Sequence, residues 1–282
     1  MKVITFEREN RPPRPGVLES GKVYDLSGYG FSSTLELIKG GAEALKAIHS
    51  FASSSVSYAL DEIHVLAPIL RPPRIFAIGL NYQEHAAESK MKVQVVPTVF
   101  MKLSSSVTGP GSEVILPNNS AQPDYEAELA VVIGKPGYRI AAPDWEEYVF
   151  GYTIMNDVSA RDVQLATSQW TLGKSFPTFA PLGPAVVTRD EITDPHALDI
   201  RLAIDGEELQ NSNTRDLIFR IPELIEYISS LTPLEAGDII STGTPQGVGL
   251  GRIPQRWLRD NEEMVITIAG LGELRNRTRA EV

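Results

Sequence analysis

Short apolar runs, separated by glycine- and proline-rich turns, dominate the pattern of hydrophobic and polar positions along this chain. Runs of this length that are rich in valine, isoleucine and phenylalanine are typical of strands. They lie at 1–6, 22–26, 76–80, 98–103, 128–134, 149–157, 185–188, 199–205, 238–243 and 263–270.

Helical periodicity is scarce by comparison. It extends over 33–52, where Gly40-Gly41 weakens it, and over 82–90 and 221–231. Strands and helices do not alternate regularly, so a parallel sheet built from βαβ units is not expected. The pattern predicts a β-rich α+β fold.

The consecutive prolines Pro72-Pro73 mark the best candidate for a domain boundary. We expect a small N-terminal α/β domain at 1–72 and a larger, β-rich domain at 73–282. With 282 residues, 42% of them hydrophobic, the chain is long enough to bury a full core.

The composition narrows the possible partners. The formal net charge is -10 and the isoelectric point is about 5.0, so we expect no nucleic acid and no anionic membrane surface as partner. No apolar run approaches the roughly 18 residues of a membrane-spanning helix. The absence of cysteine excludes disulfides and thiolate metal sites, and four histidines are too few for a histidine-rich one. The first residues lack a targeting signal, which favours a cytoplasmic protein.

The segment QPDYEAELAVVIGK at 122–135 places three acids in alternation. Asp124, Glu126 and Glu128 would share one face of an extended strand, roughly 6.5–7 Å apart along the chain. A solvated face on an edge strand is one interpretation. However, the following AVVI is apolar on both faces, as in an interior strand, and carboxylates in an interior must be compensated. A divalent cation would compensate them.

A third carboxylate stands at the end of another strand-like run. Asp157 closes VFGYTIMND, and strand ends beside loops commonly carry site residues. Three oxygen ligands without cysteine or histidine suit a hard ion, Mg²⁺ or Mn²⁺. Because ExE spacings are common in proteins, this pattern is weak by itself.

The helix expected at 82–90 carries a histidine and a glutamate on one face. His85 and Glu88 are three residues apart, a spacing at which helical side chains meet. A carboxylate beside a histidine raises its basicity, as a general base requires, whereas a plain surface pair is the alternative. Asn81 is placed to cap this helix, with Glu84 completing a capping box.

Two lysines lie in apolar or glycine- and proline-rich surroundings. Lys102 follows TVFM, and Lys174 lies in WTLGKSFPTFAPLGP, so either could pair with the acids or with an anionic substrate. The loop STGTPQGVGLG at 241–251 lacks the glycine spacing and the following helix of a dinucleotide-binding turn. It is a candidate anion site through backbone N–H groups and Thr244, or an ordinary tight turn.

Taken together, six motifs in order resemble the fumarylacetoacetate hydrolase family, in its acylpyruvate hydrolase or 2-keto acid branch. The likeness covers roughly residues 70–250, with weaker likeness towards both ends. The motifs are AIGLNYQEHAAES, VFMKLSSSVTGPG, DYEAELAVVIGK, GYTIMNDVSARDVQ, WTLGKSFPTFAPLGP and GDIISTGTPQGVG.

This resemblance implies a mixed β-roll-like catalytic fold with a small N-terminal domain, and a homodimer. It implies that Glu126, Glu128 and Asp157 hold Mg²⁺ or Mn²⁺, and it leaves Asp124 as a supporting acid. His85 and Glu88 match the water-activating dyad on the family's lid, and Lys174 matches its active-site lysine. The positions that match substrate-binding residues are Arg161, Gln164, Thr244 and Lys102.

The implied activity is metal-dependent cleavage of a C–C bond in a 2,4-dioxo acid such as an acylpyruvate or a diketo-deoxy sugar acid. Oxaloacetate decarboxylation and hydroxymuconate-type isomerisation use the same site and are alternatives. A catalytically weak relative that binds a dicarboxylate is an alternative of another class. Pro177 departs from the family's aspartate, so we expect an altered pocket wall beside Lys174. The tail of the substrate is not readable from the sequence.

Overall fold

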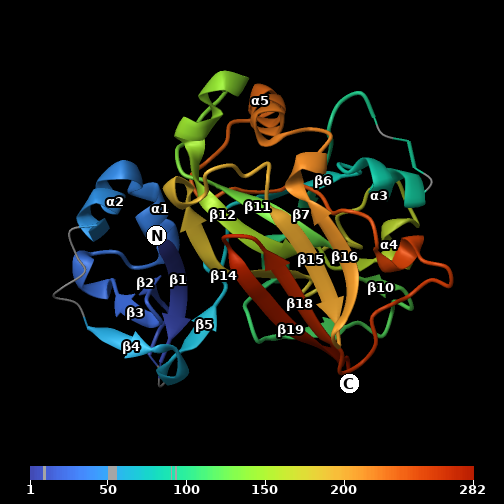
Figure 1. Cartoon of the computed structure of the whole chain (residues 1–282), viewed down its shortest axis with the longest axis horizontal. Coiled ribbons are helices and arrows are strands. Elements are labelled where there is room, and N and C mark those ends of the chain that lie inside the picture. The colour runs from blue at the N-terminus through green and yellow to red at the C-terminus, as the bar shows by residue number, and fades with distance from the viewer. Residues whose placement is uncertain (9–10, 50–55, 90, 93) are drawn as a thin grey trace.

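Two large β-sheets with few helices form the described part of the fold (Figure 1). The computed structural model describes residues 1–8, 11–49, 56–89, 91–92 and 94–282. The predicted β-rich α+β class is confirmed. None of the helices in these residues is long and apolar enough to cross a membrane.

Apolar runs form the centre of the larger sheet. β11 (Ala127–Ile133) and β12 (Val149–Asn156) are buried at every residue, and β14 (Ala180–Thr188) at all but one, as expected for strands covered on both faces. β11 pairs antiparallel with β12, and β12 with β14. The other strands of this sheet are β1 (Lys2–Glu7), β2 (Arg14–Glu19), β3 (Lys22–Asp25), β4 (Ser57–Ala59), β5 (His64–Leu66), β6 (Ile75–Gly79), β7 (Thr98–Lys102), β8 (Val107–Thr108) and β17 (Ile239–Ser241).

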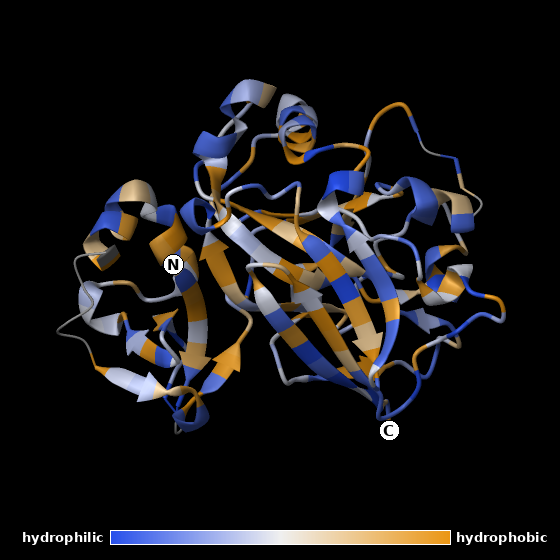
Figure 2. Ribbon diagram, viewed as in Figure 1, coloured by the Kyte–Doolittle hydropathy of each residue, from blue (hydrophilic) through white to orange (hydrophobic). Residues whose placement is uncertain are grey.

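The smaller sheet has one buried and one solvated face. Buried and exposed positions alternate along β15 (Asp199–Ile204), β18 (Glu263–Ile268) and β19 (Gly272–Ala280), and Figure 2 shows the matching alternation of hydropathy. This sheet is completed by β16 (Glu207–Asn213) and β9 (Glu113–Leu116), and β10 (Pro123–Asp124) and β13 (Ser159–Ala160) form a separate short pair.

The helices largely match the expected segments. The segment 33–52 contains two helices divided at Gly40, and its residues 50–52 lie outside the described part. The segment 82–90 forms a shorter helix, with residue 90 outside the described part, and 221–231 is confirmed. The helices are α1 (Thr34–Lys39), α2 (Gly41–His49), α3 (Gln83–Glu88), α4 (Arg161–Gln164) and α5 (Ile221–Leu231), and short 3₁₀ turns lie at Ser27–Tyr29, Leu60–Glu62, Ser104–Ser106, Ala142–Tyr148, Arg189–Glu191, Thr214–Asp216 and Gly249–Gly251.

The N-terminal segment joins the larger sheet through β1. Val3 pairs with Val186 of β14 in antiparallel register, and Val3 shares an apolar cluster with Leu37 of α1 and Phe150 of β12. The segment is therefore attached by both hydrogen bonds and apolar packing. The proposed boundary at Pro72-Pro73 stays a prediction.

The main apolar core lies where the inner face of the smaller sheet packs on the larger one. Val131 and Ile240 from the larger sheet share this cluster with Ile200 and Ile266 from the smaller one. Burial of such side chains contributes about 1.5–3 kcal/mol each. The core fixes β11 and β12 side by side, and the predicted acids lie near the ends of these two strands.

Close packing of β12 against β14 predicts a steric cost for any side chain at Gly151. A Cβ there would lie 2.1 Å from the carbonyl oxygen of Val187. We expect Gly151→Ala to lower the free energy of unfolding by about 1–3 kcal/mol, measured by urea denaturation. Gly28→Ala is the control, because its Cβ would meet nothing within 4 Å. Equal stability of the two variants would contradict this packing.

Candidate active site

The pairing of β11 with β12 brings the three predicted metal ligands together. Glu126 directly precedes β11, Glu128 lies within it, and Asp157 directly follows β12. The Asp157 amide donates to the Glu126 carbonyl oxygen at 2.9 Å. All three side chains are buried, and one carboxylate oxygen from each lies within 4.8 Å of the others. The arrangement is a candidate metal centre.

Glu128 is the acid of this cluster that no described lysine or arginine approaches within ion-pair distance. Its Oε2 accepts hydrogen bonds from Ser241 Oγ at 2.5 Å and Gly243 N at 3.0 Å. Burial raises the pKa of Glu128 well above its ordinary value, and the charges of Asp157 and Glu126 raise it further. A hard divalent cation would relieve this repulsion, and an all-oxygen donor set suits Mg²⁺ or Mn²⁺, so the residues fit such an ion.

Three buried cations neutralise the other acids. Lys174 Nζ donates to Glu126 Oε2 at 2.7 Å and to Asp157 Oδ2 at 2.8 Å. Lys102 Nζ lies 2.6 Å from Asp157 Oδ1, and Arg161 Nη2 lies 2.6 Å from Glu126 Oε1. Burial alone would raise the pKa of Glu126, but the charges of Arg161 and Lys174 hold it well below its ordinary value.

The predicted dyad forms on α3, and its histidine lines the same cavity as Glu126 and Glu128. His85 Nδ1 lies 2.9 Å from Glu88 Oε1, and His85 is buried. Glu88 also accepts a hydrogen bond from Gly247 N, at 2.9 and 3.1 Å from its two oxygens. Because an ionised carboxylate only accepts hydrogen bonds, neutral His85 carries its proton on Nδ1. Its Nε2 lone pair is then free to act as a base.

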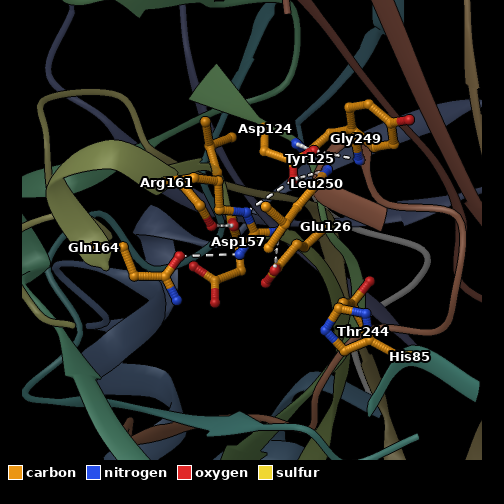
Figure 3. Close-up of polar contacts among 12 residues, drawn as sticks. His85, Asp124, Tyr125, Glu126, Asp157, Arg161, Gln164, Thr244, Gly249 and Leu250 are labelled. Atoms are coloured by element: carbon orange, nitrogen blue, oxygen red, sulfur yellow. Dashed lines mark hydrogen bonds and ion pairs between the residues drawn. The ribbon is translucent and has the colours of Figure 1, made fainter. Parts of the chain in front are cut away.

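Arg161 joins several of the remaining candidates. Its Nε donates to Asp124 Oδ2 at 2.8 Å and its Nη1 to Gln164 Oε1 at 3.0 Å (Figure 3). Thr244 lines the same cavity as His85, and its hydroxyl oxygen accepts from Gln210 Nε2 at 2.8 Å. Arg161, Gln164 and Thr244 all line the cavity between the dyad and the acids.

Two sequence expectations do not match the positions of their residues. Lys102 is buried behind Asp157, also contacts the carbonyl oxygens of Val158 and Lys174, and does not line the cavity. It therefore supports an acid, and its position does not support direct substrate contact. Pro177 is exposed in a separate surface hollow, so the expected change in the pocket wall beside Lys174 is wrong.

The expected helix cap is also wrong. The residue that caps α3 is Tyr82, without a side-chain cap hydrogen bond, and so the capping box with Glu84 does not form. The Asn81 amide instead donates to the carbonyl oxygens of Phe219 and Thr242 at 3.0 and 2.7 Å. Asn81 is fully buried and pins two distant loops beside the site, which a local sequence motif does not reveal.

The cavity itself is small, about 30 Å³, and its wall includes side chains that the sequence pattern did not single out. Trp170 packs over Gly79 and meets Phe100 edge-on at a centroid distance of 5.4 Å. Phe100 in turn lies beside the Lys174 ammonium, and Leu250 lines the same cavity. The residue types around these side chains do not indicate a functional role, although Phe100 and Trp170 lie within the motifs shared with the family.

A sequence profile described as fumarylacetoacetate (FAA) hydrolase C-terminal matches residues 74–279. The chain belongs to the fumarylacetoacetate hydrolase family. The family expected from the six ordered motifs is confirmed, and the acid cluster and the dyad both lie within the matched region.

Relatives in this family carry out more than one reaction. The chain is 40% identical to the mitochondrial oxaloacetate tautomerase Fahd2a of Rattus norvegicus, over 98% of this chain and 91% of that protein. Its fold is similar to fumarylacetoacetate hydrolase from Exiguobacterium antarcticum, with 35% identity and a TM-score of 0.88 over 100% of both chains. It is also similar to maleylpyruvate hydrolase from Sphingobium sp. SYK-6 in complex with manganese(II) and pyruvate, with 29% identity and a TM-score of 0.86 over 100% of both chains.

The acid cluster predicts opposite effects of one substitution with and without metal. In Glu128→Gln the amide oxygen can keep the bonds from Ser241 and Gly243, while the charge repelled by the other acids is removed. Without metal, the variant should melt at or above the wild-type temperature. With Mn²⁺ at about 100 times its Kd, the wild type should gain about 2.7 kcal/mol and the variant far less.

Differential scanning fluorimetry in EDTA and in Mn²⁺ measures both effects. Glu207→Gln is the matched control, because Glu207 is exposed on β16. Equal metal stabilisation of the wild type and Glu128→Gln would exclude Glu128 as a ligand.

Proposed function

We propose that the chain is a divalent-metal-dependent enzyme that cleaves the C–C bond of a 2,4-dioxo acid of the acylpyruvate type. The observation that carries the proposal is the placement of one base. His85 and the acids Glu126 and Glu128 line the same cavity, and Glu88 contacts the Nδ1 of His85, which leaves Nε2 as its candidate basic atom. A substrate in this cavity would therefore lie between a candidate water-activating group and a candidate metal site.

The metal assignment follows from the acid cluster. Glu126, Glu128 and Asp157 would hold Mg²⁺ or Mn²⁺, which when bound acts as a Lewis acid towards the 2-keto oxygen and the carboxylate of the substrate. The structure of the Sphingobium relative with manganese(II) and pyruvate supports this assignment. Arg161, Gln164 and Thr244 line the same cavity and are proposed to orient the carboxylate of the substrate.

The chain's own residues account for the proton transfers. His85, oriented by Glu88, takes a proton from water, and the resulting hydroxide attacks the carbonyl carbon C4. The C3–C4 bond breaks, its electron pair stays on C3 as the enolate of pyruvate, and the acyl group leaves as a carboxylic acid. Protonated His85 returns a proton to C3, which gives pyruvate. Lys174 lines the same cavity and is proposed to stabilise the enolate charge.

Oxaloacetate tautomerisation is the second candidate. The 40% identity to the rat oxaloacetate tautomerase over 98% of this chain favours it. In this reaction His85 would move a proton between C3 and the enol oxygen, with no attack by water. Decarboxylation of oxaloacetate and isomerisation of hydroxymuconate-like acids would also form an enolate, and the same residues would stabilise it.

A cytoplasmic homodimer is part of the proposal and rests on the sequence and on the family resemblance. Sedimentation analysis of the purified chain tests the dimer. The alternative to an enzyme is a catalytically weak relative that binds a dicarboxylate. Metal binding without conversion of any keto acid would support that alternative.

The base assignment predicts a large kinetic effect at one histidine. With Mg²⁺ present, His85→Ala should lower kcat about 10²–10⁴-fold, measured as loss of the enol absorbance of acetylpyruvate with coupled detection of pyruvate. His64→Ala is the control, because His64 is exposed. A fully active His85→Ala variant would exclude His85 as the base.

The same assay with oxaloacetate separates the candidate reactions. Pyruvate from acetylpyruvate alone supports hydrolysis, whereas interconversion of oxaloacetate tautomers without pyruvate release supports the tautomerase. Pyruvate and carbon dioxide from oxaloacetate would identify a decarboxylase.

A further inference from the structure

The glycine-rich loop at 247–251 binds two carboxylates of the chain itself. Gly247 N donates to Glu88, and the amides of Gly249 and Leu250 donate to Asp124 at 2.7 and 3.0 Å. These amides are the donors that an external anion would require. The loop was expected to bind an anion, and at these positions its amides bind the carboxylates of Glu88 and Asp124.

Each glycine of the loop permits one of these close contacts. A Cβ at Gly251 would lie 2.6 Å from both Cδ and Oε2 of Glu88. A Cβ at Gly249 would lie 2.7 Å from Asp124 Oδ1 and 1.9 Å from a backbone oxygen. Gly247 has a φ of +100°, a conformation that L side chains rarely adopt. Side chains at these positions would push the loop away from the two carboxylates.

The loop thus connects the base to the metal-binding acids. His85 contacts Glu88, and Glu88 contacts the loop. On the other side of the loop, Asp124 accepts from Arg161 Nε at 2.8 Å, and Arg161 Nη2 lies 2.6 Å from Glu126. Figure 3 shows Asp124 between Gly249 and Arg161. Asp124 is fully buried, so water does not compete for the hydrogen bonds that it accepts.

We propose that loop 247–251 acts as a carboxylate clamp that sets the position of the base relative to the acids. Asp124 and Gly251 are positioning residues in this clamp, because neither contacts His85 directly. The inference rests on the proposed function in naming His85 as the base. The contacts that define the clamp do not depend on which keto acid is the substrate.

The physical consequence concerns the proton on His85. Glu88 fixes that proton on Nδ1 only while the Glu88 carboxylate is held in place. The hydrogen bond from Gly247 N holds this carboxylate. Displacement of Glu88 would release the ring and favour the commoner tautomer with the proton on Nε2. The Nε2 of that tautomer carries a proton and has no free lone pair, so this nitrogen cannot take a proton from water.

The first test reads the tautomer without any substrate. Two-dimensional ¹H–¹⁵N spectra of the histidine side chains would be recorded on metal-free protein. Among the signals of the four histidines, those of His85 are the ones that disappear in His85→Gln. The wild type should show His85 protonated on Nδ1. Gly251→Ala and Asp124→Asn should both shift His85 towards Nε2 protonation. Gly28→Ala, whose Cβ would be unhindered, should not.

The second test separates turnover from binding. Gly251→Ala should lower kcat about 10–100-fold, the size expected when a group that orients a functional histidine is lost. KM and the Mn²⁺ Kd, from isothermal titration calorimetry, should stay within about threefold, because Gly251 contacts neither the acids nor the cavity.

Unchanged His85 signals in a folded Gly251→Ala variant would overturn the clamp. A folded Asp124→Asn variant that loses metal affinity but keeps the His85 tautomer would also overturn it, since Asp124 would then serve the acids alone. If Asp124→Asn does not fold, Gly251→Ala decides. If no keto acid is turned over but the tautomer shifts occur, the clamp stands and the proposed function fails.

Discussion

Three carboxylates buried within 4.8 Å of one another must be compensated by positive charge, and much of this site follows from that constraint. Lys174, Lys102 and Arg161 approach two of the acids and are themselves buried. Among the described residues, Glu128 has a hydroxyl and an amide as hydrogen-bond donors, and burial, followed by the charges of Asp157 and Glu126, raises its pKa. A divalent cation would complete the compensation, so the proposed metal site would also balance the charge.

The same constraint explains why the site lies on the central strands. β11 and β12 are buried throughout and held by a dense apolar core, which gives the acids fixed positions. The proposed base lies instead on the short helix α3, which contacts the 247–251 loop through the hydrogen bond between Glu88 and Gly247. A rigid acid cluster and a separately held base suit chemistry in which the substrate head is fixed while protons move.

Apolar periodicity predicted the central strands, because strands buried on both faces are apolar at almost every residue. It missed β2, β16 and β19. β2 begins at Arg14 directly after two prolines, and the polar outward positions of β16 and β19 hide their alternation. The ordered motifs identified the acids, His85, Glu88 and Lys174, because their spacing is specific in combination. The capping role expected of Asn81 is wrong, and the position of Lys102 beside Asp157 does not support the expected substrate contact, because both side chains depend on partners that are distant in sequence.

The sequence by itself determined the family, the β-rich class and the residue types of the site, because these depend on local pattern and on motif order. Only the tertiary structure decided which charges meet. Asp124 is bound by an arginine 37 positions away and by an amide 125 positions away. Contacts over such separations follow from strand pairing and core packing, and the local pattern around Asp124 is the same whether it faces solvent, a metal or a glycine loop.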